Sequence, residues 1–331
     1  MAAAKRVTLK TIADSTGLAI ATVSRALKGD LAIKEETRRR VQQAAIEVGY
    51  VPSSAGLRMR TGRSFTIAAV FPIGLELAGY SNTLINGIAT ALHGTKYSLH
   101  VCPYHPSDNA LQRIGDLVES RAADGILLNA IKPEDLRVRY LLDKGFPFVT
   151  HGRSSWEDEH DYYDYDNQAF GRMAVERLVE RGRKNVVVIT PPCDQRFGVD
   201  LSRGCVQAAQ ATGAQLYLLC DVHGDCAVDV ISKALTTKLA KTEGVDAIIA
   251  PTANACLASI DVIERLGLEL GRDVDIVFKD ERNVSVWIHK ELIVIEEDTS
   301  TAGAALAKSL VTRIENPDAP LSQFVEPPVF F

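Results

Sequence analysis

Apolar residues recur every three or four positions in three short segments near the N-terminus, residues 9–15, 19–27 and 35–48. This spacing places them on one face of a helix, so the pattern predicts three amphipathic helices. Thr8 is positioned to cap the first helix, and Gly17 is expected to end it. The faces expected to pack hold Leu9, Ile12 and Ala13 in the first helix and Val41, Ala44, Ala45 and Val48 in the third.

The second of these helices has two chemically different sides. At ~100° per residue, the side expected to pack collects Ala19, Val23, Ala26 and Leu27. The opposite side collects Ile20, Ala21, Ser24, Arg25 and Lys28. Two helices joined by a glycine-containing turn and supported by a third helix form the helix-turn-helix plan, whose second helix enters the DNA major groove. Spacing alone leaves a small solvated three-helix bundle as the alternative.

From residue 65 onward, short apolar runs alternate with amphipathic stretches. The candidate strands are residues 66–71, 99–103, 125–129, 146–150, 186–190, 215–220, 247–250, 275–278 and 292–295. Helical stretches such as 81–92, 111–120, 167–181 and 255–266 lie between most of them. This alternation predicts parallel sheets with helices on both faces, and a break near residues 151–165 predicts two lobes rather than one sheet.

The composition is that of a globular protein with more than one core. The chain has 331 residues, of which 46% are hydrophobic and 24% charged, and this length predicts about two domains of ~100–200 residues. No apolar stretch approaches the ~20 residues of a membrane span, and the N-terminus lacks a signal-peptide pattern, so we expect a cytoplasmic protein with no membrane partner. The six cysteines are scattered without zinc or Cys-x-x-Cys spacing, and we expect buried thiols.

The charge is distributed unevenly along the chain. The formal net charge is −5, but residues 1–63 hold 12 Lys or Arg against 5 Asp or Glu, a net charge of +7. The remainder has 25 basic and 37 acidic residues, a net charge of −12. A basic module attached to an acidic one indicates that the basic part meets a polyanion such as DNA.

The sequence lacks the usual signatures of an enzyme. It contains no Gly-x-Gly-x-x-Gly after a strand, no phosphate-binding Gly-Lys-Ser or Gly-Lys-Thr, no Gly-x-Ser-x-Gly and no His-Glu-x-x-His. We therefore expect no enzyme activity, no cofactor and no metal. His151 is expected to hydrogen-bond at a pocket rim. The acidic and aromatic run at residues 156–166 could bind a cation, but a solvated crossover loop is the favoured interpretation.

Several residues near the N-terminus form a pattern that resembles a known family. The pattern comprises Val7, Thr8 and Leu9, Ile12 and Ala13, Gly17, the run from Thr22 to Leu27, Thr37 and Arg38, and Gly49 to Pro52. It resembles the headpiece of the lactose-repressor (LacI/GalR-type) family of bacterial transcriptional regulators. The resemblance implies a multidomain chain, with an all-α helix-turn-helix headpiece and an α/β periplasmic-binding-protein-like core of two parallel-sheet lobes.

The domain boundaries expected from this resemblance divide the chain into three parts. Residues 1–52 form the DNA-binding headpiece, residues 53–63 a hinge helix or linker, and residues 64–331 the core for effector binding and dimerisation. Within the core, the N-lobe is expected at about 64–163 and 299–325, and the C-lobe at about 164–298.

The resemblance also implies which headpiece positions contact DNA: Thr8, Ile20, Ala21, Thr22, Ser24, Arg25 and Lys28. Ile20 and Ala21 are apolar and could only meet thymine methyl groups or leave a position unread, so Arg25 should carry base recognition, most naturally of guanine. Ala19 and Lys34 replace the family's helix caps, which should cost ~0.5–2 kcal/mol each. The arginines at 38, 39 and 40 open the third helix, where the helix dipole favours anions, and a nearby phosphate would explain them.

The resemblance also implies a second DNA contact, in the segment that follows the headpiece. In the family it becomes a short helix only when two subunits sit on DNA, and it inserts a leucine of each subunit into the minor groove. Met59 occupies the position of that leucine, where an apolar wedge kinks the duplex. Arg58, Arg60 and Arg63 would then hold flanking phosphates. Gly56 disfavours a helix by ~1 kcal/mol relative to Ala, so the hinge should depend on DNA and on the dimer for its order. Composition alone would suggest a flexible basic linker.

A small-molecule site is expected between the lobes, because ligands of open α/β sheets lie beyond the carboxyl ends of the strands. The candidate effector residues are Phe71, Pro72, Tyr80, His151, Asp166, Arg196, Thr252 and Asp280. Rings and carboxylates together suit a sugar-like polyol, since rings stack on its apolar face and carboxylates accept from its hydroxyls. Asp280 matches the family's effector-binding aspartate. The family's effector arginine falls on Leu201, so Arg196 or Arg203 would have to replace it.

These features predict a homodimeric transcriptional repressor that binds a palindromic operator in double-stranded DNA and senses a small molecule, a sugar or sugar derivative. The ligand would act by preferring one lobe arrangement, with ~1–3 kcal/mol of coupling, and both release and strengthening of DNA binding stay open. The chain lacks the leucine-heptad tail of the family's tetramers, which favours a dimer. The rival hypothesis is a stand-alone sugar-binding or sugar-modifying α/β protein with an incidental basic N-terminus.

Overall fold

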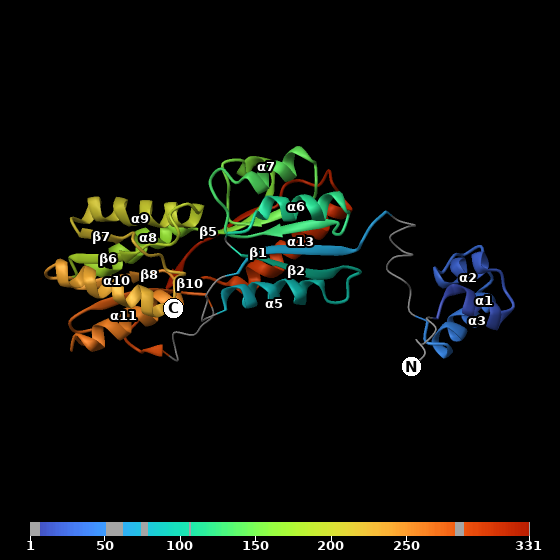
Figure 1. Ribbon diagram of the computed structural model, residues 1–331, viewed down its shortest axis with the longest axis horizontal. Helices are drawn as coiled ribbons and strands as arrows, with labels where there is room; N and C mark the ends of the chain where they lie inside the picture. Colours follow the sequence, from blue (N-terminus) through green and yellow to red (C-terminus); the bar gives the residue numbers. More distant parts are fainter. Residues whose placement is uncertain (1–6, 51–61, 74–78, 106, 282–287, 331) are drawn as a thin grey trace. The chain divides into compact units, whose positions relative to one another are not determined.

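The computed structural model describes residues 7–50, 62–73, 79–105, 107–281 and 288–330. The chain divides into two compact units, Met1–Ser64 and Phe65–Phe331, which we call the headpiece and the core (Figure 1). No helix within those described ranges is long and apolar enough to cross a membrane.

The described part of the headpiece consists of short helices around a small apolar centre. They are α1 (Leu9–Thr16), α2 (Ile20–Leu27) and α3 (Glu35–Glu47). The buried side chains come from all of them and are Ile12, Ala13, Val23, Ala26, Val41 and Ala45. The predicted helices and their packed faces are confirmed, except that Ala19, expected on the packed side of the second helix, is exposed and precedes α2 as its N-cap.

The ends of these helices follow from single residues. Gly17 takes a φ of 67°, a left-handed conformation that side chains disfavour, and it ends α1. Neither Ala19 before α2 nor Lys34 before α3 provides a side-chain hydrogen bond. The headpiece is therefore held mainly by its apolar centre and not by its caps.

All three arginines near the start of α3 have partners within the headpiece, and Arg38 donates to the backbone carbonyl of Asp30 at 3.3 Å. Arg39 pairs with Glu35 at 2.6 Å, one turn earlier on the same helix. Arg40 donates to the backbone carbonyl of Thr16, the last residue of α1. A cation at a helix C-terminus is favourable, so Arg40 fastens α3 to α1 without a phosphate.

The core contains two six-stranded sheets, and each sheet forms one lobe. The first lobe has the order β11-β5-β4-β3-β1-β2 and the second β12-β10-β9-β8-β6-β7. The strands are β1 (Thr66–Pro72), β2 (Ser98–Tyr104), β3 (Gly125–Leu128), β4 (Phe148–His151), β5 (Asp161–Tyr165), β6 (Asn185–Ile189), β7 (Gln215–Leu219), β8 (Ala247–Ala250), β9 (Asp275–Asp280), β10 (Ile293–Glu296), β11 (Gln323–Glu326) and β12 (Val329–Phe330). Among the described strands, only β12, which pairs with β10, runs antiparallel to its neighbour. The first five strands of each lobe follow the 2-1-3-4-5 order of a doubly wound sheet.

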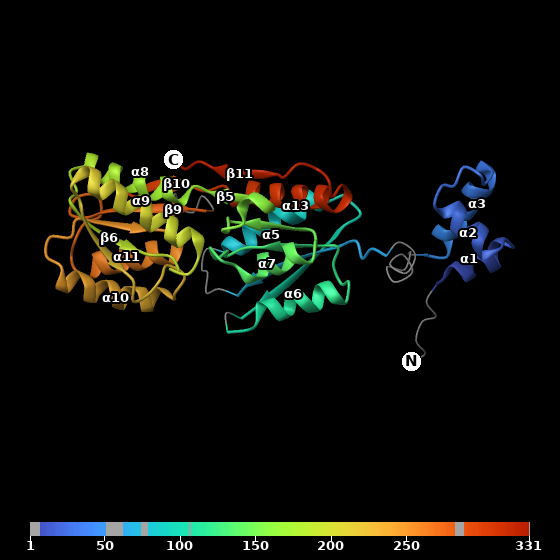
Figure 2. The same cartoon turned by 90° about the horizontal axis from the view of Figure 1, so that it is seen from above.

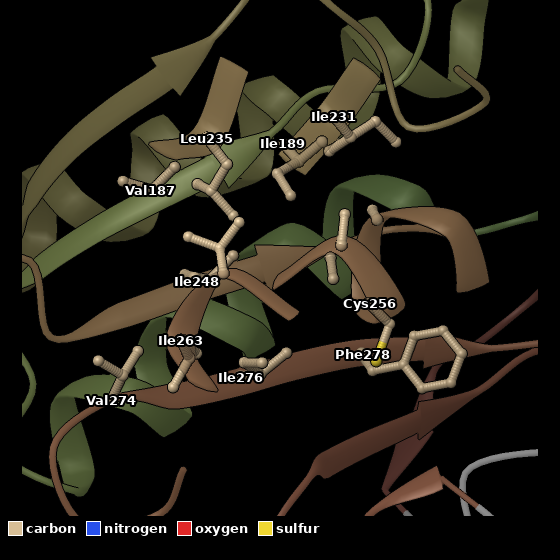
Figure 3. Close-up of a cluster of buried hydrophobic side chains, with 14 of the residues drawn as sticks. Val187, Ile189, Ile231, Leu235, Ile248, Cys256, Ile263, Val274, Ile276 and Phe278 are labelled. Carbon is tan, nitrogen blue, oxygen red and sulfur yellow. The ribbon is translucent and has the colours of Figure 1, made fainter. Parts of the chain in front are cut away.

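Helices cover both faces of each sheet (Figures 1 and 2). In the first lobe, α5 (Tyr80–Leu92) and α13 (Thr299–Glu315) cover one face, and α6 (Ala110–Glu119) and α7 (Leu136–Asp143) cover the other. In the second lobe, α8 (Asn167–Glu180) and α9 (Arg196–Thr212) lie opposite α10 (Val228–Lys241) and α11 (Ala253–Arg265). Figure 3 shows Leu235 of α10 near Ile248 and Ile263 of α11 near Ile276, on the face of the sheet that these two helices cover. The prediction of two α/β lobes with parallel sheets is confirmed.

The paired helices approach each other through glycines. A Cβ atom added at Gly204 of α9 would lie 2.0 Å from the backbone oxygen of Gln168 in α8. A Cβ atom at Gly87 of α5 would lie 2.2 Å from the backbone oxygen of Ser300 in α13. Both distances are far below van der Waals contact, so each pair requires glycine at its crossing. This close packing places the N-termini of α8 and α9 beside the strand ends of the second lobe.

The chain passes between the lobes after β5, after β10 and between β11 and β12. Glu326, at the end of β11, links these crossings. Its carboxylate accepts hydrogen bonds from the backbone N–H of Asp298 at 2.8 Å and from the hydroxyl of Tyr163 at 3.0 Å. Its backbone carbonyl accepts from the N–H of Asp166 at 2.9 Å. One glutamate thus ties the three crossings together.

The prediction of a solvated loop at residues 156–166 was wrong. The segment contains β5, an interior strand of the first sheet that is largely buried. Its acidic residues pair with arginines of the chain, Asp161 with Arg313 at 2.7 Å and Asp164 with Arg153 at 2.6 Å. The strand was not recognised in the sequence because two of its five residues are aspartates and three consecutive acidic residues, 157–159, precede it, a composition that is typical of loops. Strands β11 and β12 were not predicted either, because both are short and they flank a pair of prolines.

The expectation that all cysteines are buried was also wrong. Cys102, Cys205 and Cys256 are buried and Cys226 is partly buried. Cys193 and Cys220, however, are exposed. Both follow strands of the second lobe, where the chain leaves the sheet.

Candidate functional site

The first candidate site is the outward side of α2. Ile20 is 48% exposed, Ala21, Arg25 and Lys28 are also exposed, and Thr22 and Ser24 are half-buried. Thr8, which precedes α1, is exposed as well. Val23 and Ala26 point into the headpiece and anchor the helix. The structure therefore presents the predicted DNA-contacting residues on a surface, with their helix held from behind.

Arg25 has a partner on this surface in the absence of DNA. Its Nε lies 2.8 Å from a carboxylate oxygen of Asp30, and both side chains are exposed. The second oxygen of Asp30 accepts from the backbone N–H of Ala32 at 3.0 Å. The Arg25 guanidinium and the Ala32 N–H hold the pKa of Asp30 below its usual value. Asp30 therefore stays charged and keeps Arg25 directed toward the loop after α2.

The predicted minor-groove contacts at Met59, Arg58 and Arg60 lie outside the described residues. Arg63 is described, near the end of the unit Met1–Ser64. Their roles remain expectations from the sequence.

The second candidate site lies where the strands of the first lobe end. Phe71, the residue before Pro72, is buried in the same apolar cluster against which Tyr80 packs. The hydroxyl of Tyr80 lies 2.5 Å from Nδ1 of His151, the last residue of β4. The ring of His151 also stacks with that of Tyr163 on β5, with ring centroids 6.3 Å apart. The structure thus brings together four of the predicted effector residues, from β1, α5 and β4.

A chain of polar contacts leads from these residues into the second lobe. Nε2 of His151 lies 3.9 Å from Oε1 of Glu297, and Oε2 of Glu297 lies 2.6 Å from Nζ of Lys279. That ammonium group also lies 3.4 Å from Glu281 and 3.4 Å from Oδ1 of Asn167. We call Tyr80, His151, Asn167, Lys279, Glu281 and Glu297 the interlobe cluster. Tyr80 and His151 belong to the first lobe, Lys279 to the second, and Glu297 to a crossing between them.

The interlobe cluster is buried and its charges are paired. The side chains of Lys279 and Glu297 are only 4% and 3% exposed. Burial would lower the pKa of Lys279, but the Glu297 and Glu281 carboxylates outweigh it and hold that pKa above its usual value. Burial lowers the pKa of His151, and Lys279 adds to this effect while Glu297 opposes it. His151 is therefore a neutral imidazole near pH 7.

Two polar atoms near this cluster are buried without a hydrogen-bond partner among the described residues, Nε2 of His151 and the hydroxyl of Tyr165. In the tautomer in which Nδ1 of His151 accepts from Tyr80, Nε2 carries a proton and can donate. One hydroxyl placed ~2.8 Å from both Nε2 and Oε1 of Glu297 would fill the 3.9 Å gap between them. An unsatisfied buried donor beside a carboxylate is the arrangement expected where a hydroxylated ligand binds.

Two of the predicted effector residues cap helices, and a third, Asp280, lies at the end of a strand. Asp166 caps α8 by accepting from the N–H of Ala169 at 2.8 Å. Thr252 caps α11 and donates to the backbone carbonyl of Gly224 at 2.6 Å. Asp280 ends β9 beside Lys279 with a buried side chain. The capping signals at Asp166 and Thr252 were visible in the sequence, because each precedes a helix.

Arg196 and Arg203, the two candidates to replace the family's effector arginine, lie in different surroundings. Leu201, where the family has its effector arginine, is completely buried in the second lobe's core. Arg196 pairs with Asp200 at 2.8 Å and lies 3.6 Å from Glu157 of the first lobe. Arg203 lies 3.5 Å from the same aspartate and is half exposed. Arg196 is therefore the one that has a partner in the opposite lobe.

Sequence reasoning missed another cation of this region, Arg153. It pairs with Asp164 and lies 3.7 Å from Asp200 of the second lobe. Burial raises the pKa of Asp164 to about 6, with Arg153 acting against it. Glu297 and Lys279 were missed as well. A lysine inside the apolar strand β9 was the available signal, since a buried lysine requires a carboxylate partner.

Two hollows in the described surface lie away from these residues. One of about 860 Å³ lies between α10 and α11 and is lined by Ser232, Asn254 and Asp261 among others. Another of about 330 Å³ lies beside α13, β5 and β11, next to Tyr162 and Phe324. Neither is lined by a predicted effector residue. The location of the second candidate site therefore rests on the strand ends and on the interlobe cluster.

Comparison with known proteins covers both units. Residues 8–53 match bacterial regulatory proteins of the lacI family, and residues 76–286 match a periplasmic binding protein domain. The HTH-type transcriptional regulator CelR of Thermobifida fusca is 29% identical over 315 residues, which cover 94% of this chain and 92% of CelR. The HTH-type transcriptional regulator AglR of Rhizobium meliloti (strain 1021) is 27% identical over 320 residues, covering 94% and 88%. These relatives are regulators and not enzymes.

The chain also resembles solved structures over nearly its whole length. A complex of the transcriptional regulator CelR with cellobiose has a TM-score of 0.71 and 26% sequence identity, covering 98% of both chains. The Lac repressor dimer bound to operator and the anti-inducer ONPF has a TM-score of 0.87 at 18% identity, again covering 98% of both chains. The latter likeness concerns the fold.

Proposed function

The chain belongs to the lacI family of bacterial regulatory proteins and is a DNA-binding transcriptional regulator, and from this premise we propose its assembly, its operator and its ligand. It binds a palindromic operator as a homodimer and represses transcription there. A sugar that binds between the lobes changes its affinity for DNA. The proposed hinge, residues 53–63, transmits that change.

The outward side of α2 is the observation that supports DNA reading. Arg25 lies in the last turn of this helix, and its fork of N–H groups matches guanine O6 and N7. Ile20 and Ala21, at the start of the helix, provide only apolar contacts to thymine methyl groups. Recognition of the half-site therefore depends mostly on Arg25, with Ser24 and Lys28 beside it.

The substitution Arg25→Ala tests this proposal. A preferred duplex is first selected from random sequences with the full chain, and its affinity is then measured by gel shift at several salt concentrations. Loss of a bidentate base contact should weaken binding by ~1–3 kcal/mol and relax selectivity at one base pair of each half-site. Arg172→Ala is the matched control, because Arg172 is an exposed arginine of α8 that pairs with Glu176.

An unchanged affinity and selectivity of Arg25→Ala would contradict this role. Failure of the wild-type chain to select any duplex would instead favour the rival hypothesis of a stand-alone sugar-binding protein. The two results are distinguishable because the first leaves DNA binding intact.

The dimer follows from the geometry of recognition. Each chain carries one recognition helix, which covers one half-site, and two chains related by a two-fold axis read a palindrome. Sedimentation of the full chain with and without the selected duplex should give two chains per duplex. One chain per duplex, or a selected site without two-fold symmetry, would rule out the dimer.

The buried donor of His151 beside Glu297 is the observation that supports a polyhydroxy ligand. Tyr80, whose hydroxyl contacts His151, supplies aromatic surface close to it, and Asp280 ends strand β9 of the second lobe. Such a mixture of rings, donors and carboxylates suits a sugar. CelR, whose structure was solved with cellobiose, is the relative that makes cellobiose the first probe.

The proposed ligand acts by linkage. It changes DNA affinity only as far as it prefers one lobe arrangement, which is typically ~1–3 kcal/mol. The test is a thermal-shift screen of cellobiose and other sugars, repeated in the presence of the selected duplex. Asp280→Ala should keep DNA binding and abolish the response to the sugar that stabilises the wild type. A normal response in this variant would exclude Asp280 from the site.

A further inference from the structure

The two exposed cysteines lie just beyond the ends of neighbouring strands of the second lobe. Cys220 directly follows β7, and Cys193 lies four residues after the end of β6. These strands are parallel neighbours, with Ile189 opposite Leu219 as their last registered pair. One residue further along, Thr190 therefore lies opposite Cys220.

The side chains on this edge share one face of the sheet. Ile189 and Leu219 point toward α10 and α11, whereas Val188 and Leu218 point toward α8 and α9. Because successive residues of a strand alternate between faces, Thr190 and Cys220 point toward α8 and α9. The chain then turns back, and Sγ of Cys193 lies 4.0 Å from the Thr190 hydroxyl. Both thiols thus flank the side chain of Thr190.

The remaining cysteines differ in burial and in position. Burial raises the pKa of the Cys205 thiol to about 12, and it also raises the pKa of the Cys102 and Cys256 thiols. Cys226, the next cysteine along the chain, packs against the cluster between α10 and α11, on the opposite face of the sheet. Burial raises the pKa of Cys220 too, and Cys193 adds to this effect.

We propose that Cys193 and Cys220 form a peroxide-sensitive thiol pair that closes to a disulfide. Hydrogen peroxide is the oxidant. The Cys193 thiolate attacks one peroxide oxygen, the O–O bond breaks, and a sulfenic acid and one water form. The Cys220 thiolate then attacks the sulfenic sulfur, the S–O bond breaks, and a second water leaves after protonation. Two thiols and one peroxide give one disulfide and two waters.

The disulfide would anchor a loop that contacts the other lobe. Asp194, the residue after Cys193, pairs with Lys132 of the first lobe at 2.7 Å. The backbone N–H of Arg196 donates to the carbonyl of Ile131 at 2.8 Å. Without the disulfide, this loop is joined to the second lobe mainly through its own chain. With it, the loop is tied to the end of β7, and the contact between the lobes is restrained.

The first measurement is the site of oxidation. The full chain is treated with hydrogen peroxide, remaining thiols are alkylated, and the protein is digested with trypsin and Asp-N, which cleaves before Asp221 and so separates Cys220 from Cys226. The wild type should lose about 2 Da per chain and give linked peptides that hold Cys193 and Cys220. Cys193→Ser and Cys220→Ser should each lack the linked peptides, whereas Cys102→Ser should retain them.

Links to Cys226, disulfides between two chains, or sulfinic and sulfonic acids without a link would overturn the proposal. The second measurement addresses the loop. Hydrogen exchange of the Arg196 amide should be slower by about threefold or more in the oxidised wild type than in the reduced one, and unchanged in treated Cys220→Ser. Equal exchange in both wild-type forms would show that the disulfide does not restrain the interlobe contact.

Discussion

The outward side of α2 and the interlobe cluster use charge in opposite ways. On α2, Arg25 and Asp30 form an ion pair in contact with water, from residues five positions apart. In the interlobe cluster, Lys279 and Glu297 form an ion pair that water hardly reaches, and their partner His151 lies on another lobe. The first pair can exchange for a phosphate or a base at little cost. The second cannot separate without leaving a buried charge.

This difference indicates what each region does. A reading surface must give up its internal partners when DNA arrives, so its contacts are exposed and weak. A joint between lobes must transmit a small change at a ligand without loosening, so its contacts are buried and connected. Under the proposed functions, the same side-chain types serve DNA recognition in the headpiece and coupling between the lobes in the core.

The largest expected effect comes from breaking the buried pair. Glu297→Gln removes one charge and leaves Lys279 with only the more distant Glu281, so the free energy of unfolding of the core should fall by ~3–5 kcal/mol. Urea unfolding followed by circular dichroism measures this change. The double variant Lys279→Met with Glu297→Gln, which removes both charges, should recover much of the loss.

The exposed pair of Arg172 and Glu176 provides the control for that experiment, because it lies on the surface of α8. Glu176→Gln should lower the free energy of unfolding by less than ~1 kcal/mol. If Glu297→Gln lowered the free energy of unfolding as little as Glu176→Gln does, the buried pair of Lys279 and Glu297 would contribute no more than a surface pair.

A smaller effect is expected from Asp164, which contacts Arg153 close to the same crossings. Its pKa in the folded protein is about 6, above the usual value near 3.8. The folded state therefore binds more protons than the unfolded state between these pH values, and this contribution to stability is gained as pH falls and lost as pH rises through 6. Between pH 7.5 and 5, wild type should gain about 1 kcal/mol relative to Asp164→Asn. A constant difference between the two proteins over this range would show that Asp164 is not shifted.

The smallest effect concerns the exposed pair. Asp30→Asn keeps an acceptor for the Ala32 N–H but removes the charge that holds Arg25. Binding to the selected duplex should tighten by less than about fivefold, because exposed pairs are weak and Arg25 is already available to DNA. Gel shifts at several salt concentrations measure it. Weaker binding by this variant would mean that Asp30 helps to present Arg25 rather than merely holding it.

The helices of the headpiece could be predicted because their packed faces follow a local periodicity in the sequence. The apolar spacing of Ile12, Val23 and Val41 determines which face packs, and the remaining face of α2 follows by exclusion. The alternation of strands and helices likewise predicts the two lobes, since it needs only neighbouring residues. The site between the lobes was predicted in part. Phe71 and His151 were identified because they end strands, whereas Arg153, Lys279 and Glu297 were not.

The sequence by itself determined the fold class, the family and the helices of the headpiece, because each is recorded in residues that are close along the chain. Only the tertiary structure decided which charges are joined. Glu297 meets Lys279 across 18 positions, and Arg313 meets Asp161 across 152. No local pattern encodes such pairs, because they exist only once the crossings bring the strand ends together. The same reason explains why an acidic run predicted as a loop is the buried strand β5.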